Sequence, residues 1–392
     1  MKRISRKMLS AFALFTLLMA LVPLSPLRAE NRTVSTNARA AALIDVTSGR
    51  ILYSSRGDEP MLIASLTKIM TAIVAIENSD LSSMVKVSKN ASGKEGSSLY
   101  LKQGEEMTLE NMLYGLMLRS GNDAATAIAE HVGGSEEGFV HLMNAKAEEL
   151  NLKHTHFANP HGLDAEGHYS SANDLAVLTA YALHNPVFAE IVKTKEKTAD
   201  NPNEAWDYKW SNKNKMLRLY EGADGVKTGY TKKALRCLVS SATRGGQQLV
   251  AVTINDGNDW NDHMSLLDFG FNHYPLKTLV ERGEGVSGYD LAAGKTLAYP
   301  LGQGEEDRIV TRMVLQEANA SRAADTSFGL KGMLVIQLGG KDIGRVPLYA
   351  RDQLPPLVAP KRNEPASAEA YSADNWLEAL GSTFKALFHV GS

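Results

Sequence analysis

The stretch that decides the fold is ASLTKIMTAIVAIE, residues 64–77. It predicts a helix over Ser65–Glu77 that leaves almost no polar side. A helix that is apolar all round is buried in a large core. Ser65 and Lys68 are three residues apart, so they share one face of this helix about one turn apart. We therefore expect a hydroxyl and an amine side by side at the start of a buried helix.

A serine and a lysine in this arrangement suit nucleophilic catalysis. The unperturbed pKa of lysine is about 10.4, but burial and a second cation lower it, and a neutral Lys68 could then take the proton of Ser65. The free N–H groups of the helix N-terminus suit a developing oxyanion at Ser65. The S-x-x-K pattern alone is weak, because surface Ser/Lys neighbours are common. Its position at the start of a buried helix favours the catalytic interpretation.

A second motif, Ser120-Gly121-Asn122, directly follows an amphipathic helix that Thr108 can cap. One interpretation is an ordinary helix C-terminal turn, where Gly and Asn are frequent. The other is a hydroxyl and an amide that project into a cleft. There Ser120 could pass a proton to a leaving amine, and Asn122 could hold a substrate amide.

A third motif, Lys227-Thr228-Gly229, lies in a predicted strand over Val226–Thr231. The tripeptide is common by itself. On a sheet-edge strand beside a cleft, it offers a cation and a hydroxyl for a substrate carboxylate. Gly229 allows a ligand to approach the backbone closely, and the N–H of Tyr230 could be the second oxyanion donor.

The surrounding pattern predicts an α+β fold. Two strand runs, residues 40–45 and 50–54, form a hairpin, and three more follow a helical block at 226–231, 235–242 and 249–255. This order favours one antiparallel five-stranded sheet covered by helices. Ser135 is a predicted N-cap within the helical block, and a further helix, residues 172–184, follows Ser171.

The chain divides into six predicted segments. Residues 1–29 have the basic start and apolar run of a signal peptide. A mature N-terminal tail (30–39), a catalytic domain (40–274), a small C-terminal β domain (275–354) and a Pro-rich linker (355–370) follow. Residues 371–392 form an amphipathic helix, which predicts peripheral anchoring on the outer, extracytoplasmic face of the membrane after export.

Composition limits the possible partners. The formal net charge of −2 over 392 residues gives no basic field for nucleic acid. The single cysteine, Cys237, excludes an internal disulfide, and its apolar strand-like surroundings predict a buried side chain rather than a nucleophile.

Together the three motifs are specific, and they characterise penicillin-binding proteins and class A β-lactamases. Residues 40–274 resemble the low-molecular-mass penicillin-binding proteins that are serine-type D-alanyl-D-alanine carboxypeptidases. The resemblance rests on the segments ASLTKIMT (64–71), SGNDA (120–124), NPHGL (159–163), YSSA (169–172) and DGVKTGYT (224–231). After Thr231 the family usually has a small Gly-containing link, whereas this chain has KKALRC (232–237), which leaves the shape of that loop open.

The resemblance implies an enzyme that removes the terminal D-alanine from peptidoglycan stem peptides ending in D-Ala-D-Ala, with β-lactams as inhibitors. It implies Ser65, Lys68 and Ser120 as catalytic residues, and Asn122, Lys227, Thr228, Gly229 and Tyr230 as substrate-binding residues. No cofactor or metal is implied.

Three alternatives remain at this point. A β-lactamase would share the motifs but needs a deacylating base, typically in an E-x-x-L-N loop, and Asp164 and Glu166 do not form that pattern. A non-catalytic penicillin sensor would keep Ser65 without turnover. A zinc peptidase would draw on His154, His156, His161 and His168, although loop or surface histidines explain the same cluster.

Overall fold

The computed structural model describes residues 34–315 and 329–356. They form two compact units. Unit 1 consists of residues 34–277 and 299–307, and unit 2 of residues 278–298, 308–315 and 329–356. The predicted signal peptide, most of the predicted linker and the predicted terminal helix lie outside the described residues.

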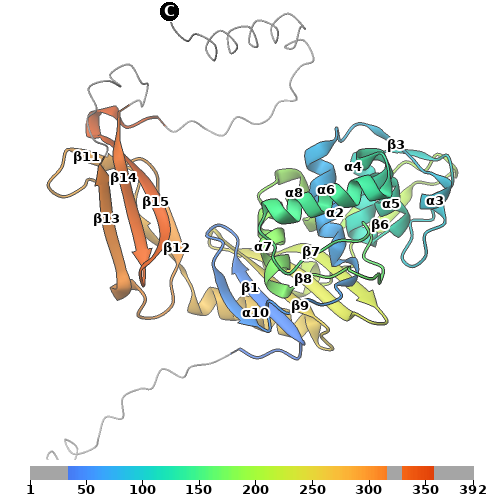
Figure 1. The fold of residues 1–392 in the computed structure, drawn as a ribbon, viewed down its shortest axis with the longest axis horizontal. Helices are drawn as coiled ribbons and strands as arrows, with labels where there is room; N and C mark the ends of the chain where they lie inside the picture. Colours follow the sequence, from blue (N-terminus) through green and yellow to red (C-terminus); the bar gives the residue numbers. More distant parts are fainter. Residues whose placement is uncertain (1–33, 316–328, 357–392) are drawn as a thin grey trace, which may run out of the picture. The chain divides into compact units, whose positions relative to one another are not determined.

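Unit 1 is built on a five-stranded antiparallel sheet in the order β2-β1-β9-β8-β7 (Figure 1). The strands are β1 Ala40–Asp45, β2 Ile51–Ser55, β7 Ala223–Thr231, β8 Leu235–Arg244 and β9 Gln247–Ile254. The predicted α+β class with one antiparallel sheet is confirmed. The Lys227-Thr228-Gly229 motif therefore lies on an edge strand.

Both faces of this sheet are covered. Along β1, Ala40, Ala42 and Ile44 pack into the main core, whereas Ala41 and Leu43 pack into a second core. This alternation follows the period of two in a strand. The main core holds α2 Lys68–Asn78, α4 Leu109–Tyr114, α5 Asn122–Gly133, α6 Glu136–Glu149, α7 Ala172–Leu183 and α8 Pro186–Lys193. The second core holds α9 Met216–Leu219 and α10 Asp259–His273.

Short elements complete unit 1: β3 Met84–Lys86 pairs with β4 Glu106–Thr108, β5 Glu196–Ala199 pairs with β6 Tyr208–Ser211, and α3 spans Lys89–Ser92. The two predicted N-caps, Thr108 and Ser135, are confirmed, and Ser171 also caps its helix, because each side chain accepts a hydrogen bond from a backbone N–H of the first turn. The distances are 3.3 Å for Thr108, 3.0 Å for Ser135 and 3.1 Å for Ser171.

Two predicted helices differ in detail. The nucleophile segment begins with a 3-10 turn over Ala64–Thr67, and the α-helix starts only at Lys68. The hydroxyl of Thr67 donates to the carbonyl of Ala64 at 2.9 Å, which stabilises this tight turn. The helix capped by Thr108 changes at Gly115 into a π-helical turn, Gly115–Arg119, and Ser120 ends it in a left-handed conformation with φ 67°.

The unusual link after Thr231 keeps a tight β7–β8 hairpin without glycine. Leu235 takes the left-handed conformation, with φ 61°, and is 42% exposed. Thr231 contributes a side-chain contact, since its Oγ1 accepts from the N–H of Ala234 at 3.0 Å. A leucine thus occupies a backbone conformation that glycine adopts more easily.

Unit 2 contains a four-stranded antiparallel sheet in the order β11-β15-β14-β13. The bounds are β11 Leu291–Ala293, β13 Ile309–Leu315, β14 Leu330–Leu338 and β15 Lys341–Ala350. Its small core comprises Val280, Ala293, Ile336 and Val346. The chain passes between the units along β10 Leu276–Val280 and β12 Leu297–Pro300, which pair with each other.

Within the described residues, no single helix has both the length and the hydropathy of a membrane span; only α7 and α8 taken together, with a bend of 107° between them, reach both.

Candidate active site

Lys68 is the centre of the site. It begins α2, is completely buried, and its Nζ lies 3.1 Å from Ser65 Oγ, 2.7 Å from Asn122 Oδ1 and 2.5 Å from the carbonyl oxygen of His161. A neutral amine has two N–H donors and one lone pair. Asn122 and His161 can take the two donors, which leaves the lone pair for the hydroxyl proton of Ser65.

The electrostatics favour that neutral amine. Burial holds the pKa of Lys68 well below its ordinary value, and the positive charges of Lys227 and Lys213 lower it further, against the opposing charge of Asp123. Burial and the charge of Lys213 also lower the pKa of Lys227, to about 7. Lys227 and Lys213 thus disfavour a proton on Lys68, and Lys213 disfavours one on Lys227.

Strand β7 lies directly against the nucleophile turn. A Cβ added at Gly229 would come within 3.2 Å of both the Ser65 nitrogen and the Ile63 carbonyl oxygen, so only glycine fits without displacement. On the same strand Lys227 is buried and its Nζ donates to the carbonyl of Thr228 at 2.8 Å, whereas Tyr230 is exposed. The structure thus brings the first and third motifs together.

The second motif meets Lys68 through Asn122. Its Oδ1 accepts from Lys68, and its Nδ2 donates to the carbonyl of Glu95 at 2.6 Å. Both ends of this amide are therefore occupied within the protein, and the residue orients the lysine. Ser120 is buried two residues earlier, at the left-handed end of the π-helical turn.

Sequence analysis missed Lys213. This residue follows β6 in a loop, where its N–H donates to the carbonyl of Leu118 at 3.1 Å and its Nζ donates to Ser97 Oγ at 3.3 Å. It influences the site only through its charge on Lys68 and Lys227. No local pattern signals that role, because the loop and the two lysines meet only in the folded chain.

His161 lay in a segment noted for its resemblance, but without a role. Its carbonyl accepts from Lys68, and its ring Nε2 lies 3.3 Å from Glu136 at the start of α6. Glu136 also pairs with Lys94 at 2.8 Å, and the contacts with His161 and Lys94 lower the pKa of Glu136 to about 2. This network fixes the backbone that positions Lys68.

The other histidines serve structural contacts. His168 lies in a loop, as expected, but it is buried, with Nε2 2.7 Å from Thr67 Oγ1 and Nδ1 accepting from the N–H of Ala158. His156 Nδ1 lies 2.6 Å from the carbonyl of Gly167. In residues 34–315 and 329–356 no group of three or more His, Cys, Asp or Glu side chains could hold a metal ion.

Cys237 is buried, as predicted, and burial raises the pKa of its thiol to about 12. The thiolate, which is the nucleophilic form, is therefore strongly disfavoured. Cys237 is therefore not a candidate nucleophile, and Ser65 beside Lys68 remains the candidate.

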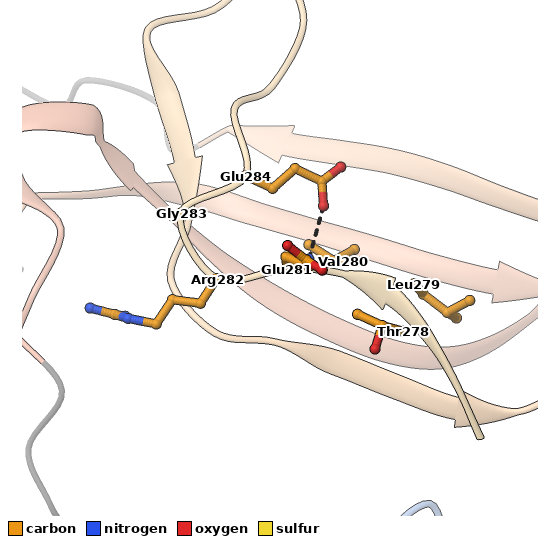
Figure 2. Close-up of a pocket in the computed structure, with 7 residues that line it drawn as sticks. All are labelled: Thr278, Leu279, Val280, Glu281, Arg282, Gly283 and Glu284. Carbon is orange, nitrogen blue, oxygen red and sulfur yellow. Dashed lines mark hydrogen bonds between the residues drawn. The ribbon is translucent and has the colours of Figure 1, made fainter.

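A pocket in unit 2 lies at the end of β10 and is lined by Thr278–Glu284 (Figure 2). Within it the carboxylate of Glu284 accepts a hydrogen bond from the N–H of Glu281 at 2.8 Å. The lining contains no serine, cysteine or histidine, and so no paired nucleophile and base. It does not compete with the Ser65 site as a candidate active site.

Comparisons with known proteins agree with this geometry. A family model described as D-alanyl-D-alanine carboxypeptidase matches residues 27–258. The chain is 34% identical over 372 residues to the D-alanyl-D-alanine carboxypeptidase DacF of Bacillus subtilis, which covers 89% of this chain and 95% of that protein. It is 34% identical over 345 residues to DacC of Escherichia coli, which covers 82% of this chain and 85% of that one.

Solved structures give the same result. Penicillin binding protein 5 from Haemophilus influenzae is similar, with a TM-score of 0.65 and 28% identity over 80% of this chain and 96% of that one. The Streptomyces K15 DD-transpeptidase is similar, with a TM-score of 0.58 and 32% identity over 61% of this chain and 98% of that one.

Proposed function

This chain belongs to the D-alanyl-D-alanine carboxypeptidase family, and from that premise we propose that Ser65 is the residue it acylates and Lys68 the base that activates it. The observation that carries the proposal is the contact of a buried Lys68 Nζ with Ser65 Oγ at 3.1 Å, within a cluster of three lysines. The substrate is a peptidoglycan stem peptide ending in D-Ala-D-Ala.

Acylation follows from this geometry. Lys68 Nζ takes the Ser65 proton while Oγ bonds to the carbonyl carbon between the two D-alanines. The backbone N–H groups of Ser65 and Tyr230 hold the oxyanion. The C–N bond then breaks. Ser120 passes its hydroxyl proton to the leaving amine of D-alanine and takes up in return the proton that Lys68 accepted from Ser65, so that Lys68 is neutral again.

Substrate orientation and deacylation complete the cycle. Lys227 and Thr228 on β7 bind the terminal carboxylate of the substrate. This pairing favours the protonated form of Lys227, whose pKa is otherwise lowered by burial. Water finally hydrolyses the ester at Ser65 and releases the shortened peptide. β-Lactams acylate the same hydroxyl and so inhibit the enzyme.

The test is release of D-alanine from a pentapeptide ending in D-Ala-D-Ala. Wild-type protein should release it, and Ser65→Ala should not. A protein that forms a stable penicillin adduct but releases no D-alanine would be a sensor instead. A protein that destroys penicillin rapidly and leaves the peptide intact would be a β-lactamase.

We also propose export and peripheral anchoring on the outer face of the membrane. Support comes from the sequence of residues 1–29 and from the terminal segment, where the spacing of Trp376, Leu380 and Phe384 predicts one apolar face if the segment is helical. A truncation after Pro365 should leave the membrane fraction and keep full activity on a soluble peptide. If the truncated, signal-cleaved protein still pellets with membranes, the terminal segment is not the anchor.

A further inference from the structure

Tyr100 is an exposed aromatic residue held in an unusual conformation. Its side chain is 84% exposed and its φ is +64°, a left-handed conformation that is rare for a bulky residue. Its neighbours Leu99 and Leu101 are buried. The ring contributes little to the core, and the backbone at this position is strained. Folding alone therefore gives no reason for tyrosine here.

A buried carboxylate fixes this conformation. Asp123, which is fully buried, accepts from the Ser98 hydroxyl at 2.6 Å, from the N–H of Leu99 at 2.9 Å and from the N–H of Leu101 at 3.1 Å. The N–H of Tyr100 itself donates to Ser98 Oγ at 2.8 Å. The loop is thus preorganised with its aromatic ring directed outward.

The same loop forms a wall of the active site. The carbonyl of Ser97 accepts from the N–H of Asn122 at 2.7 Å, and Ser97 Oγ accepts from Lys213. Tyr100 follows Ser97 by three residues, so the two residues are at most about 10 Å apart along the chain. The exposed ring therefore belongs to the loop that borders the Ser65 site at Ser97.

A second exposed aromatic residue lies on the adjoining loop. Trp206 precedes β6 and is 67% exposed. Its loop is tied to the Tyr100 loop by the Lys102–Glu204 ion pair at 2.9 Å, and Asn203 Nδ2 donates to Glu105 at 2.7 Å. Each aromatic residue is two positions from one member of that ion pair. The Lys102–Glu204 ion pair neutralises the two charges that lie between Tyr100 and Trp206 on these loops.

We propose that Tyr100 and Trp206 form a saccharide-binding rim that stacks against an amino-sugar ring of the glycan strand bearing the stem peptide. This inference rests on the proposed function. In a pentapeptide, three residues separate the D-Ala-D-Ala end from the sugar, so a substrate bound at Ser65 carries its sugar only a short length of chain away. Exposed aromatic rings on the loops that border the site offer apolar faces against which a sugar ring can pack.

The test compares binding of a disaccharide-pentapeptide with binding of the bare pentapeptide. We use the full chain carrying Ser65→Ala, so that binding is read without turnover, by calorimetry and by tryptophan fluorescence. The Ser65→Ala protein should bind the disaccharide-pentapeptide more tightly than it binds the bare pentapeptide. When Tyr100→Gly or Trp206→Ala is added, the ratio of the two affinities should fall about 3- to 10-fold, the scale of one aromatic contact.

Matched variants separate the ring from the loop. Glycine suits the positive φ at position 100, so Tyr100→Gly removes the ring without strain, and Tyr100→Phe should keep the preference. Tyr289→Ala in unit 2, another exposed tyrosine, should change nothing. Two results would overturn the proposal that Tyr100 and Trp206 bind the saccharide. One is equal affinity of the Ser65→Ala protein for the two ligands, and the other is an unchanged affinity ratio after Tyr100→Gly and Trp206→Ala. Failure of the wild-type protein to release D-alanine from either peptide instead refutes the proposed function and leaves the binding comparison valid.

Discussion

Replacement of Gly229 by alanine tests the contact between β7 and the nucleophile turn. The added Cβ would lie 3.2 Å from the Ser65 nitrogen, 3.2 Å from the Ile63 carbonyl oxygen and 3.3 Å from the Ala64 Cβ. The φ of Gly229 is not positive, so alanine brings no backbone strain. The neighbours need to move by only a few tenths of an ångström. Overpacking of this kind costs about 1–3 kcal/mol, so the protein should still fold.

Catalysis should suffer far more than folding. The methyl group would press against the backbone amide of Ser65, which we propose as an oxyanion donor, and such a donor acts within about 2.7–3.1 Å of the oxyanion. Loss of one donor typically lowers the rate by about 10²–10³-fold. We therefore expect Gly229→Ala to lower the second-order rate constant of penicillin acylation by that factor. The melting temperature should fall by about 2–4 °C per kcal/mol lost.

The control is Gly257→Ala, since a Cβ at Gly257 meets nothing within 4 Å and its φ is not positive. It should match the wild-type protein in both rate and melting temperature. Acylation of a folded Gly229→Ala protein at the wild-type rate would refute the placement of the oxyanion donor beside β7.

Three further predictions concern charges in unit 1. Lys68→Arg should keep the charge but lose about 10²–10⁴-fold in acylation rate, because arginine does not deprotonate at usable pH; near-wild-type acylation would exclude Lys68 as the base. Lys227→Ala should slow cleavage of a D-Ala-D-Ala peptide far more than cleavage of the same peptide with an amidated end, and equal losses for both peptides would move its role to the tuning of Lys68. His263 is buried between Ser240 and Thr253, and burial lowers its pKa to about 3 from an ordinary 6.5. Its depressed pKa contributes stability that is complete above about pH 6.5 and is lost as the pH falls toward 3. His263→Gln should therefore lose less stability than the wild-type protein between pH 7 and pH 4 in urea unfolding, and an identical loss would contradict this account.

Much of the fold could be predicted because its signals are local. Polar side chains at Thr108, Ser135 and Ser171 cap the helices they precede, and alternating apolar residues mark the strands. The three-residue spacing of Ser65 and Lys68 was sufficient to predict their contact, because both residues lie within one turn of the chain.

Other features could not be predicted because they depend on distant segments. Lys213 reaches the site only through the loop after β6, and the carboxylate of Asp123 organises backbone groups more than twenty residues earlier. The π-helical turn before Ser120 has no sequence signal comparable to a cap. These are tertiary contacts, and local periodicity carries no information about them.

The most direct test of the central claim is to locate the penicillin adduct. Mature protein is incubated with a labelled penicillin, digested, and mapped by mass spectrometry, with Ser65→Ala in parallel. We predict a single labelled peptide with the acyl group on Ser65, and no label in the variant. Label on any other residue, or labelling that persists in Ser65→Ala, would contradict the assignment of Ser65 as the nucleophile.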